Sequence, residues 1–248
     1  MTWVHAVVDV PASDHAAAAA FWGRVLDWPA GPAWPGHPEL RSFEPDTGAP
    51  YVHLQEVDGP PGVHLDLECH DPAATGERAV ALGAAYVGRS DRWWTYRSPG
   101  GLAFCLLRAQ DRDAPGPATW PDGHRSRLVQ LCVDAPRSRH EAEVAFWRAL
   151  LGGRWVGSSA AEFAGKWHDD AGSPLQLLFQ RLDEDEGPVR MHLDHGTDDV
   201  GAEVRRLLGL GATDAGPGRA WHALRDPVGL AFCVTDNSPE LLPRRPLG

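Results

Sequence analysis

The chain has 248 residues, a formal net charge of −11 and 43% hydrophobic residues, which is typical of a globular protein long enough for two domains. The acidic balance argues against nucleic acid as a partner, because a phosphate backbone binds to a basic surface. No long uncharged apolar run and no leader pattern precedes the first motif, so we expect a cytoplasmic protein without a membrane segment. Four cysteines without close spacing do not form a disulfide framework.

The first part of the chain predicts an alternation of short strands with two helices. Strands are expected at 3–10, 40–45, 51–57, 63–69, 85–88, 92–97 and 102–107. Ser13 is expected to cap a helix that ends near Leu26. Asp71 and Pro72 open a second helix, which Gly83 closes. The pattern therefore contains two successive units of strand, helix and further strands.

The second half of the chain repeats the first. VHAVVDVPASDHAAAAAFWGRVL at 4–26 aligns with VQLCVDAPRSRHEAEVAFWRALL at 129–151, an offset of 125. GVHLDLE at 62–68 aligns with RMHLDHG at 190–196 at an offset of 128, and SPGGLAFCLL aligns with DPVGLAFCVT at the same offset. The change of offset predicts a three-residue insertion in the second copy, and the polar stretch at 181–190 is its natural place.

This duplication divides the chain into two similar domains. The predicted boundaries are 1–110 for domain 1, 111–126 for a linker rich in proline, glycine and charge, 127–236 for domain 2 and 237–248 for a C-terminal tail. In the second copy, Ser138 and Glu141 have the spacing of a capping box at the start of the first helix. We expect each copy to form a sheet with one face covered by helices and the other face open to a cleft.

The order of these elements, with AAFWGRVLDW after the first strand, HLDL at the midpoint and SPGGLAFCLL at the end, resembles the vicinal oxygen chelate superfamily. That superfamily includes glyoxalase I, bleomycin-resistance proteins and extradiol dioxygenases. The resemblance covers both copies. It implies an α+β fold of two tandem glyoxalase-like domains, each made of two βαβββ modules that form a curved half-barrel sheet around a cleft.

The resemblance also implies where ligands would be held. In metal-dependent relatives, four strand positions converge in the cleft. The matching positions, together with a tryptophan on the seventh strand of each copy, are His5, Gln55, His64, Trp93 and Cys105 in domain 1 and Gln130, Gln180, His192, Trp221 and Cys233 in domain 2. Both cysteines stand where relatives carry a glutamate, so no carboxylate occupies a family ligand position.

Strand parity gives a partial check that does not depend on the resemblance. His64 and Asp66 share one face of their predicted strand, and His5 and Asp9 share one face of theirs. Such polar faces either line a cleft or meet water. Their repetition in both copies favours a cleft.

Three chemical roles remain open for these positions. A divalent metal (Zn, Fe, Mn or Ni) in domain 1 would use His5 and His64, with Gln55 and Cys105 as further donors, although no cofactor is favoured. Cys105 and Cys233 act as nucleophiles only if their pKa is lowered. The alternative is that both are packed or form a wall of the cleft.

The favoured hypothesis is a protein that binds or sequesters an apolar or aromatic organic molecule in its clefts, as bleomycin-resistance proteins do. The alternative is a metal-dependent glyoxalase-like lyase, an isomerase or a dioxygenase that uses the domain 1 site, with the metal as a Lewis acid. A third hypothesis is a protein-interaction module. The expected partner is a small molecule, and the expected oligomeric state is a monomer or a homodimer.

Overall fold

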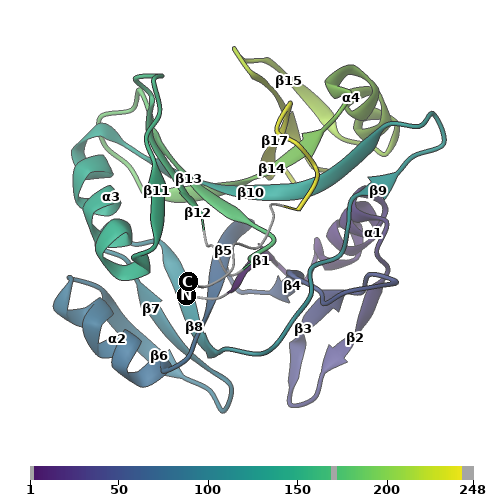
Figure 1. The fold of residues 1–248 in the computed structure, drawn as a ribbon. Coiled ribbons are helices and arrows are strands. Elements are labelled where there is room, and N and C mark those ends of the chain that lie inside the picture. The colour runs from purple at the N-terminus through teal and green to yellow at the C-terminus, as the bar shows by residue number, and fades with distance from the viewer. Residues whose placement is uncertain (1–2, 169–171, 242–248) are drawn as a thin grey trace.

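A computed structural model describes residues 3–168 and 172–241 and contains two curved, open sheets, one from each copy of the repeat (Figure 1). In domain 1 the elements are β1 (Trp3–Val10), α1 (His15–Leu26), β2 (Ala30–Trp34), β3 (His37–Phe43), β4 (Val52–Glu56), β5 (Gly62–Cys69), α2 (Pro72–Ala81), β6 (Ala85–Arg89), β7 (Trp93–Arg97) and β8 (Ala103–Arg108). A short strand, β9 (Ala118–Thr119), follows in the linker. In domain 2 the elements are β10 (Arg125–Ala135), α3 (Arg137–Leu151), β11 (Arg154–Val156), β12 (Phe163–His168), β13 (Gln176–Arg181), β14 (Arg190–Thr197), α4 (Val200–Gly209), β15 (Thr213–Pro217), β16 (Trp221–Arg225) and β17 (Ala231–Thr235).

Both sheets have the same strand order, which joins two βαβββ modules through their first strands. In domain 1 the order is β2-β3-β4-β1-β5-β8-β7-β6, and in domain 2 it is β11-β12-β13-β10-β14-β17-β16-β15. The central pairs β1–β5 and β10–β14 are antiparallel, whereas β1–β4 and β5–β8 are parallel. The predicted α+β fold with two tandem domains is therefore confirmed.

Two edge strands carry no signal in the sequence. β2, with the sequence AGPAW, and β11, with the sequence RWV, were not predicted. Glycine and proline within β2 and the shortness of β11 weaken the propensity that normally marks a strand. The predicted insertion is confirmed, because the β13–β14 loop at 182–189 is three residues longer than the β4–β5 loop at 57–61.

The helix starts correct two predictions. Asp71 caps α2 as expected, since its carboxylate accepts the Ala74 N–H at 3.0 Å. The capping role of Ser13 is wrong: Asp14 is the N-cap of α1, and the Ser13 hydroxyl bonds its side chain instead.

The capping box at Ser138 and Glu141 is also wrong, because α3 begins one residue before Ser138, directly after Pro136. The backbone N–H of Arg137 and that of Ser138 donate to carbonyl oxygens of Glu184 and Asp185. The inserted loop thus supplies the acceptors that a capping side chain would provide.

The two domains share one hydrophobic core, which lies between the helix-covered faces of the sheets. From α1, Phe21 and Trp22 contact Phe232 on β17, with ring centroids 6.0 and 5.4 Å apart. From α3, Phe146 and Trp147 contact Phe104 on β8 at 5.9 and 5.1 Å. Each domain therefore packs its first helix on the last strand of the other domain, which leaves the polar face of each sheet directed away from the shared core.

Segments between and after the domains are tied to both sheets. β9 pairs with the start of β10, and Arg127 donates to the carbonyl oxygen of Pro239 at 2.8 Å. Of the predicted tail, residues 242–248 lie outside the described residues. The domain boundaries given above stay predictions.

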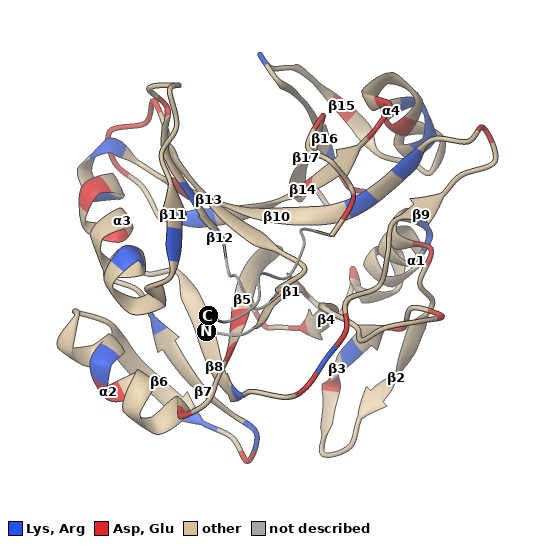
Figure 2. Ribbon diagram, viewed as in Figure 1, with Lys and Arg blue, Asp and Glu red and all other residues tan. Residues whose placement is uncertain are grey.

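All four cysteines are free and buried. Within the described ranges no helix combines the length and the apolar character that crossing a membrane requires. Acidic and basic positions are spread over both domains, on helices and loops alike (Figure 2). The net negative charge therefore does not come from one acidic segment.

Candidate ligand-binding clefts

A histidine flanked by two aspartates forms the floor of the domain 1 cleft. His64 projects from β5, and its Nδ1 lies 2.7 Å from Oδ2 of Asp9 on β1. Its Nε2 lies 3.5 Å from Oδ1 of Asp66, two residues further along β5. Cys105 on β8 is the cross-strand neighbour of Asp66 and also faces this group. The alternation of the strands places all four side chains on the same sheet face.

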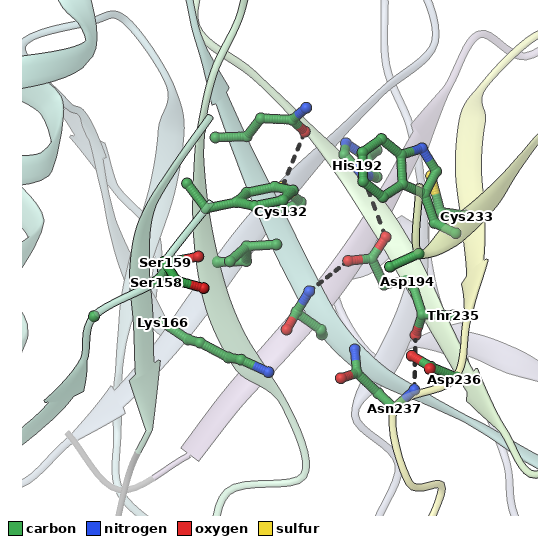
Figure 3. A pocket seen from close by; sticks show the side chains of 17 residues that line it. Cys132, Ser158, Ser159, Lys166, His192, Asp194, Cys233, Thr235, Asp236 and Asn237 are labelled. Carbon is green, nitrogen blue, oxygen red and sulfur yellow. Dashed lines mark hydrogen bonds and ion pairs between the residues drawn. The ribbon is translucent and has the colours of Figure 1, made fainter. Parts of the chain in front are cut away.

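Domain 2 repeats this arrangement with residues from the equivalent strands. His192 Nδ1 lies 2.6 Å from Asp134 Oδ2, and its Nε2 lies 3.2 Å from Asp194 Oδ1. Asp194 also accepts a hydrogen bond from the Gln130 amide at 2.5 Å. In Figure 3 Asp194 lies below His192, and Cys233 lies beside both. An Asp–His–Asp group is thus the feature that the two clefts have in common.

Some carboxylate oxygens of these groups have no hydrogen-bond partner. Oδ1 of Asp9, Oδ1 of Asp66 and Oδ1 of Asp194 are buried and unpartnered. Leaving a buried acceptor without a donor costs about 1–3 kcal/mol, so native proteins rarely do so outside functional sites. These oxygens are therefore positioned to accept a donor from a ligand or to bind a cation.

The electrostatics of the floor favour a protonated histidine and a protonated thiol. Burial opposes the charge on His64, but the carboxylate of Asp9 and hydrogen bonds to Asp66, Asp9 and Cys105 outweigh it and raise its pKa well above the usual value. Burial and the nearby Asp66 charge raise the pKa of Cys105 to about 11. In domain 2 burial likewise opposes the charge on His192, whereas Cys132, Asp134 and Asp194 raise its pKa well above the usual value. Neither cleft therefore activates a cysteine as a thiolate.

A cavity stands over each floor. The domain 1 cavity has a volume of about 280 Å³, and the domain 2 cavity has a volume of about 420 Å³. The predicted residues that line them are Gln55, His64, Trp93 and Cys105 in domain 1 and Gln130, Gln180, His192, Trp221 and Cys233 in domain 2. The structure thus brings nine of the ten predicted positions to the two cavities.

His5 is the exception, and the expectation that it converges with His64 and Cys105 is wrong. Its Nδ1 lies 2.9 Å from His53 Nε2, and its Nε2 lies 3.2 Å from the carboxylate of Glu68. These partners turn the ring into a separate cavity of about 460 Å³, at the other end of the cleft. Asp9 and Asp66, rather than His5, surround His64.

Five further residues of the floor were not among the predicted site residues: Asp9, Asp66, Cys132, Asp134 and Asp194. A sequence signal exists for the aspartates, because VD and HLD recur at matching places in both copies and put them on the same faces as the histidines. Cys132 has no such signal, since the first copy carries Val7 at that position. Its thiol lies 3.6 Å from the side-chain oxygens of Asp134 and Gln180.

The donor atoms of the floor fit a divalent cation. In domain 1 the donors of His64, Asp66 and Cys105 lie within 4.8 Å of one another. In domain 2 two such groups share His192: one adds Cys132 and Asp134, and the other adds Asp194 and Cys233. A set of imidazole, carboxylate and thiolate suits Zn²⁺ better than Mn²⁺, which prefers oxygen donors. The absence of carboxylates at the family ligand positions is thus compensated by aspartates from neighbouring positions.

Comparison with known families and structures agrees with the fold. The family profile described as a glyoxalase-like domain matches residues 5–107 and 130–235. Comparison with curated proteins gives no match.

Solved structures with a similar fold include the Mn(II)-bound glyoxalase from Novosphingobium aromaticivorans, with a TM-score of 0.69, 17% identity and coverage of 98% of this chain and 84% of that chain. A variant of 4-hydroxymandelate synthase from Streptomyces coelicolor has a TM-score of 0.61 and 17% identity over 100% of this chain and 94% of that chain. A halotolerant catechol dioxygenase has a TM-score of 0.59 and 12% identity over 98% and 88%. At these identities the structures confirm the fold of the vicinal oxygen chelate superfamily, and the fold alone.

Proposed function

We propose, from the premise that the chain belongs to the glyoxalase-like domain family, that both of its clefts bind a small organic molecule. The observation that carries this proposal is the Asp–His–Asp floor, which recurs in both domains beneath a cavity with a tryptophan in its wall. Conservation of this group between two copies that differ at most other positions supports a shared task.

The chemistry of the floor indicates the class of ligand. A cavity of about 280 or 420 Å³ is the size of a small-molecule site. Trp93 and Trp221 offer an aromatic wall for a flat, apolar body. The unpartnered oxygens of Asp66 and Asp194 accept a hydrogen bond, so the ligand carries a donor such as a hydroxyl group. An aromatic compound with a phenolic hydroxyl satisfies both requirements.

A metal-dependent lyase or dioxygenase is the second candidate function, because the donors in each floor lie close enough to share one ion. His64, Asp66 and Cys105 would hold it in domain 1, and a bound ion would act as a Lewis acid on a substrate oxygen. Thiolate formation would accompany binding, since a metal ligand must lose its proton.

The two candidates differ in their requirement for metal. The full chain, purified without chelators, is analysed by inductively coupled plasma mass spectrometry, beside His64→Ala and His192→Ala variants. Thermal shifts are then recorded with phenolic aromatic compounds before and after treatment with a chelator. Binding that survives metal removal supports the ligand-binding proposal. Stoichiometric metal that disappears in the His64→Ala variant, with binding lost at the same time, overturns it in favour of the metalloenzyme.

A further inference from the structure

We infer that the two clefts have diverged in the charge of the ligand they accept: domain 1 takes an organic anion, and domain 2 takes a neutral or cationic analogue. The inference rests on the proposed function, because it concerns ligands of the same clefts. It comes from a comparison of the two copies with each other.

The anion-binding feature of domain 1 is the second cavity, of about 460 Å³, beside the floor cavity. Trp34 lines both cavities and therefore forms their common wall. Three arginines line the second cavity, namely Arg92, Arg108 and Arg112, and none of its described lining residues is acidic. A ligand that reaches from the floor past Trp34 thus meets a basic end.

The partners of these arginines show which charges are available. Arg112 is paired with the buried carboxylate of Glu68 at 2.8 Å, so its charge is largely balanced. Arg108 donates at 3.5 Å to the carbonyl oxygen of His70, which is neutral. Arg92 lies 3.8 Å from Asp91, its exposed chain neighbour. Arg108 is the group whose charge is least compensated within the described structure.

The corresponding positions of domain 2 carry the opposite character. Because Trp93 matches Trp221, Arg92 matches Ala220, and the repeat GLAFCLLR against GLAFCVTD matches Arg108 with Asp236. Ala220 and Asp236 both line the single domain 2 cavity, which also contains the floor residues.

Lys166 lines the same domain 2 cavity and lies across it from Asp236 and Asn237 (Figure 3). One lysine faces Asp194 and Asp236 among the lining residues. An anion is therefore not favoured in this cavity, whereas the basic end of domain 1 favours one. Charge reversal at one matched position is an efficient way to separate two specificities, since it attracts one ligand and repels the other.

A matched probe series tests this inference on the full chain. The probes are 6-hydroxy-2-naphthoate, 6-hydroxy-2-naphthamide and 6-(aminomethyl)-2-naphthol, which share a phenolic hydroxyl and a ring system but differ in charge at the far end. The variants are Arg108→Asp and Asp236→Arg, which exchange the matched residues; both positions are exposed, so the fold tolerates the changes. Isothermal titration calorimetry gives the affinity of each probe for each variant.

The expected result is a crosswise pattern. Arg108→Asp weakens binding of the naphthoate roughly tenfold and leaves the amine unaffected, whereas Asp236→Arg weakens binding of the amine to a similar extent and leaves the naphthoate unaffected. If the probes bind and neither exchange alters the ratio of naphthoate to amine affinity, the charge inference is wrong and the ligand-binding proposal stands. If none of the three probes binds, both are overturned.

Discussion

The indole Nε1 of Trp22 in domain 1 donates a hydrogen bond of 3.0 Å to Asp226 Oδ2 in domain 2. Asp226 begins the turn between β16 and β17, and its other oxygen accepts the backbone N–H groups of Val228 and Leu230. One buried carboxylate thus fixes a turn and joins it to the helix of the other domain.

The opposite half of the interface solves the same problem with a different residue. Ser98 stands where domain 2 has Asp226, and the carboxylate comes from Glu143 on α3. Glu143 accepts Trp147 Nε1 and the N–H of Gly100, both at 2.8 Å. The duplicated interface has therefore kept a buried carboxylate next to its tryptophan while moving it from the turn to the helix.

Replacement of Asp226 by alanine is predicted to lower the free energy of unfolding by roughly 2–4 kcal/mol, because it leaves the Trp22 indole and two backbone N–H groups without acceptors. Urea denaturation followed by circular dichroism measures the change. The matched control is Asp183→Ala, since Asp183 is fully exposed in its pair with Arg137 and such pairs contribute about 1 kcal/mol or less. Equal effects of the two changes would contradict this account of the interface.

Replacement of Asp9 by asparagine is predicted to weaken ligand binding in domain 1 roughly tenfold, because the carboxylate holds His64 in its charged form and fixes the ring. Asp134→Asn is expected to do the same in domain 2. Titration with 6-hydroxy-2-naphthamide distinguishes the sites, since each variant retains one intact cleft. Asp58→Asn, on an exposed loop, is the control, and unchanged binding in the Asp9 variant would remove the floor from the binding site.

The cysteines are predicted to resist alkylation in the folded protein. Burial raises the pKa of Cys105 to about 11 and also raises those of Cys69, Cys132 and Cys233. Thiolates are therefore scarce at neutral pH. Iodoacetamide labelling of chelator-treated protein, followed by intact-mass analysis, is expected to be slow at pH 7.5 and to reach four adducts after denaturation. Rapid labelling of Cys105 or Cys233 in the folded state would instead indicate an activated nucleophile.

Acid is predicted to destabilise the interface between the domains through His195. Burial lowers the pKa of this histidine to about 4 from the ordinary 6.5, and its ring stacks on Trp22 at 6.3 Å. The unfolded chain binds a proton below pH 6.5, whereas the native state stays neutral until about pH 4. Stability is therefore lost as the pH falls through this window, by up to about 3 kcal/mol from this one group.

Unfolding of metal-free protein between pH 4 and pH 7 measures this dependence. The His195→Gln variant is expected to show a shallower slope, whatever its stability at pH 7. A slope identical to that of the unchanged protein would show that other groups dominate the acid response.

The sequence was sufficient for the fold and for much of the two clefts, because duplication shows which positions recur and strand alternation shows which of them share a face. His64 and Cys105 reach the same cavity for this reason. The orientation of His5 could not be predicted, since it depends on His53 and Glu68, which are remote in sequence. The role of Asp66 required the register between β5 and β8, which places it beside Cys105.

The central claim is that both clefts bind a small aromatic molecule through their Asp–His–Asp floors. Isothermal titration calorimetry of the metal-free full chain with 6-hydroxy-2-naphthamide tests it most directly, because the neutral probe suits both clefts. The account predicts two sites per chain, one site in His64→Ala and none in the His64→Ala/His192→Ala double variant. Absence of binding to the unchanged chain, or two sites retained in the double variant, would contradict it.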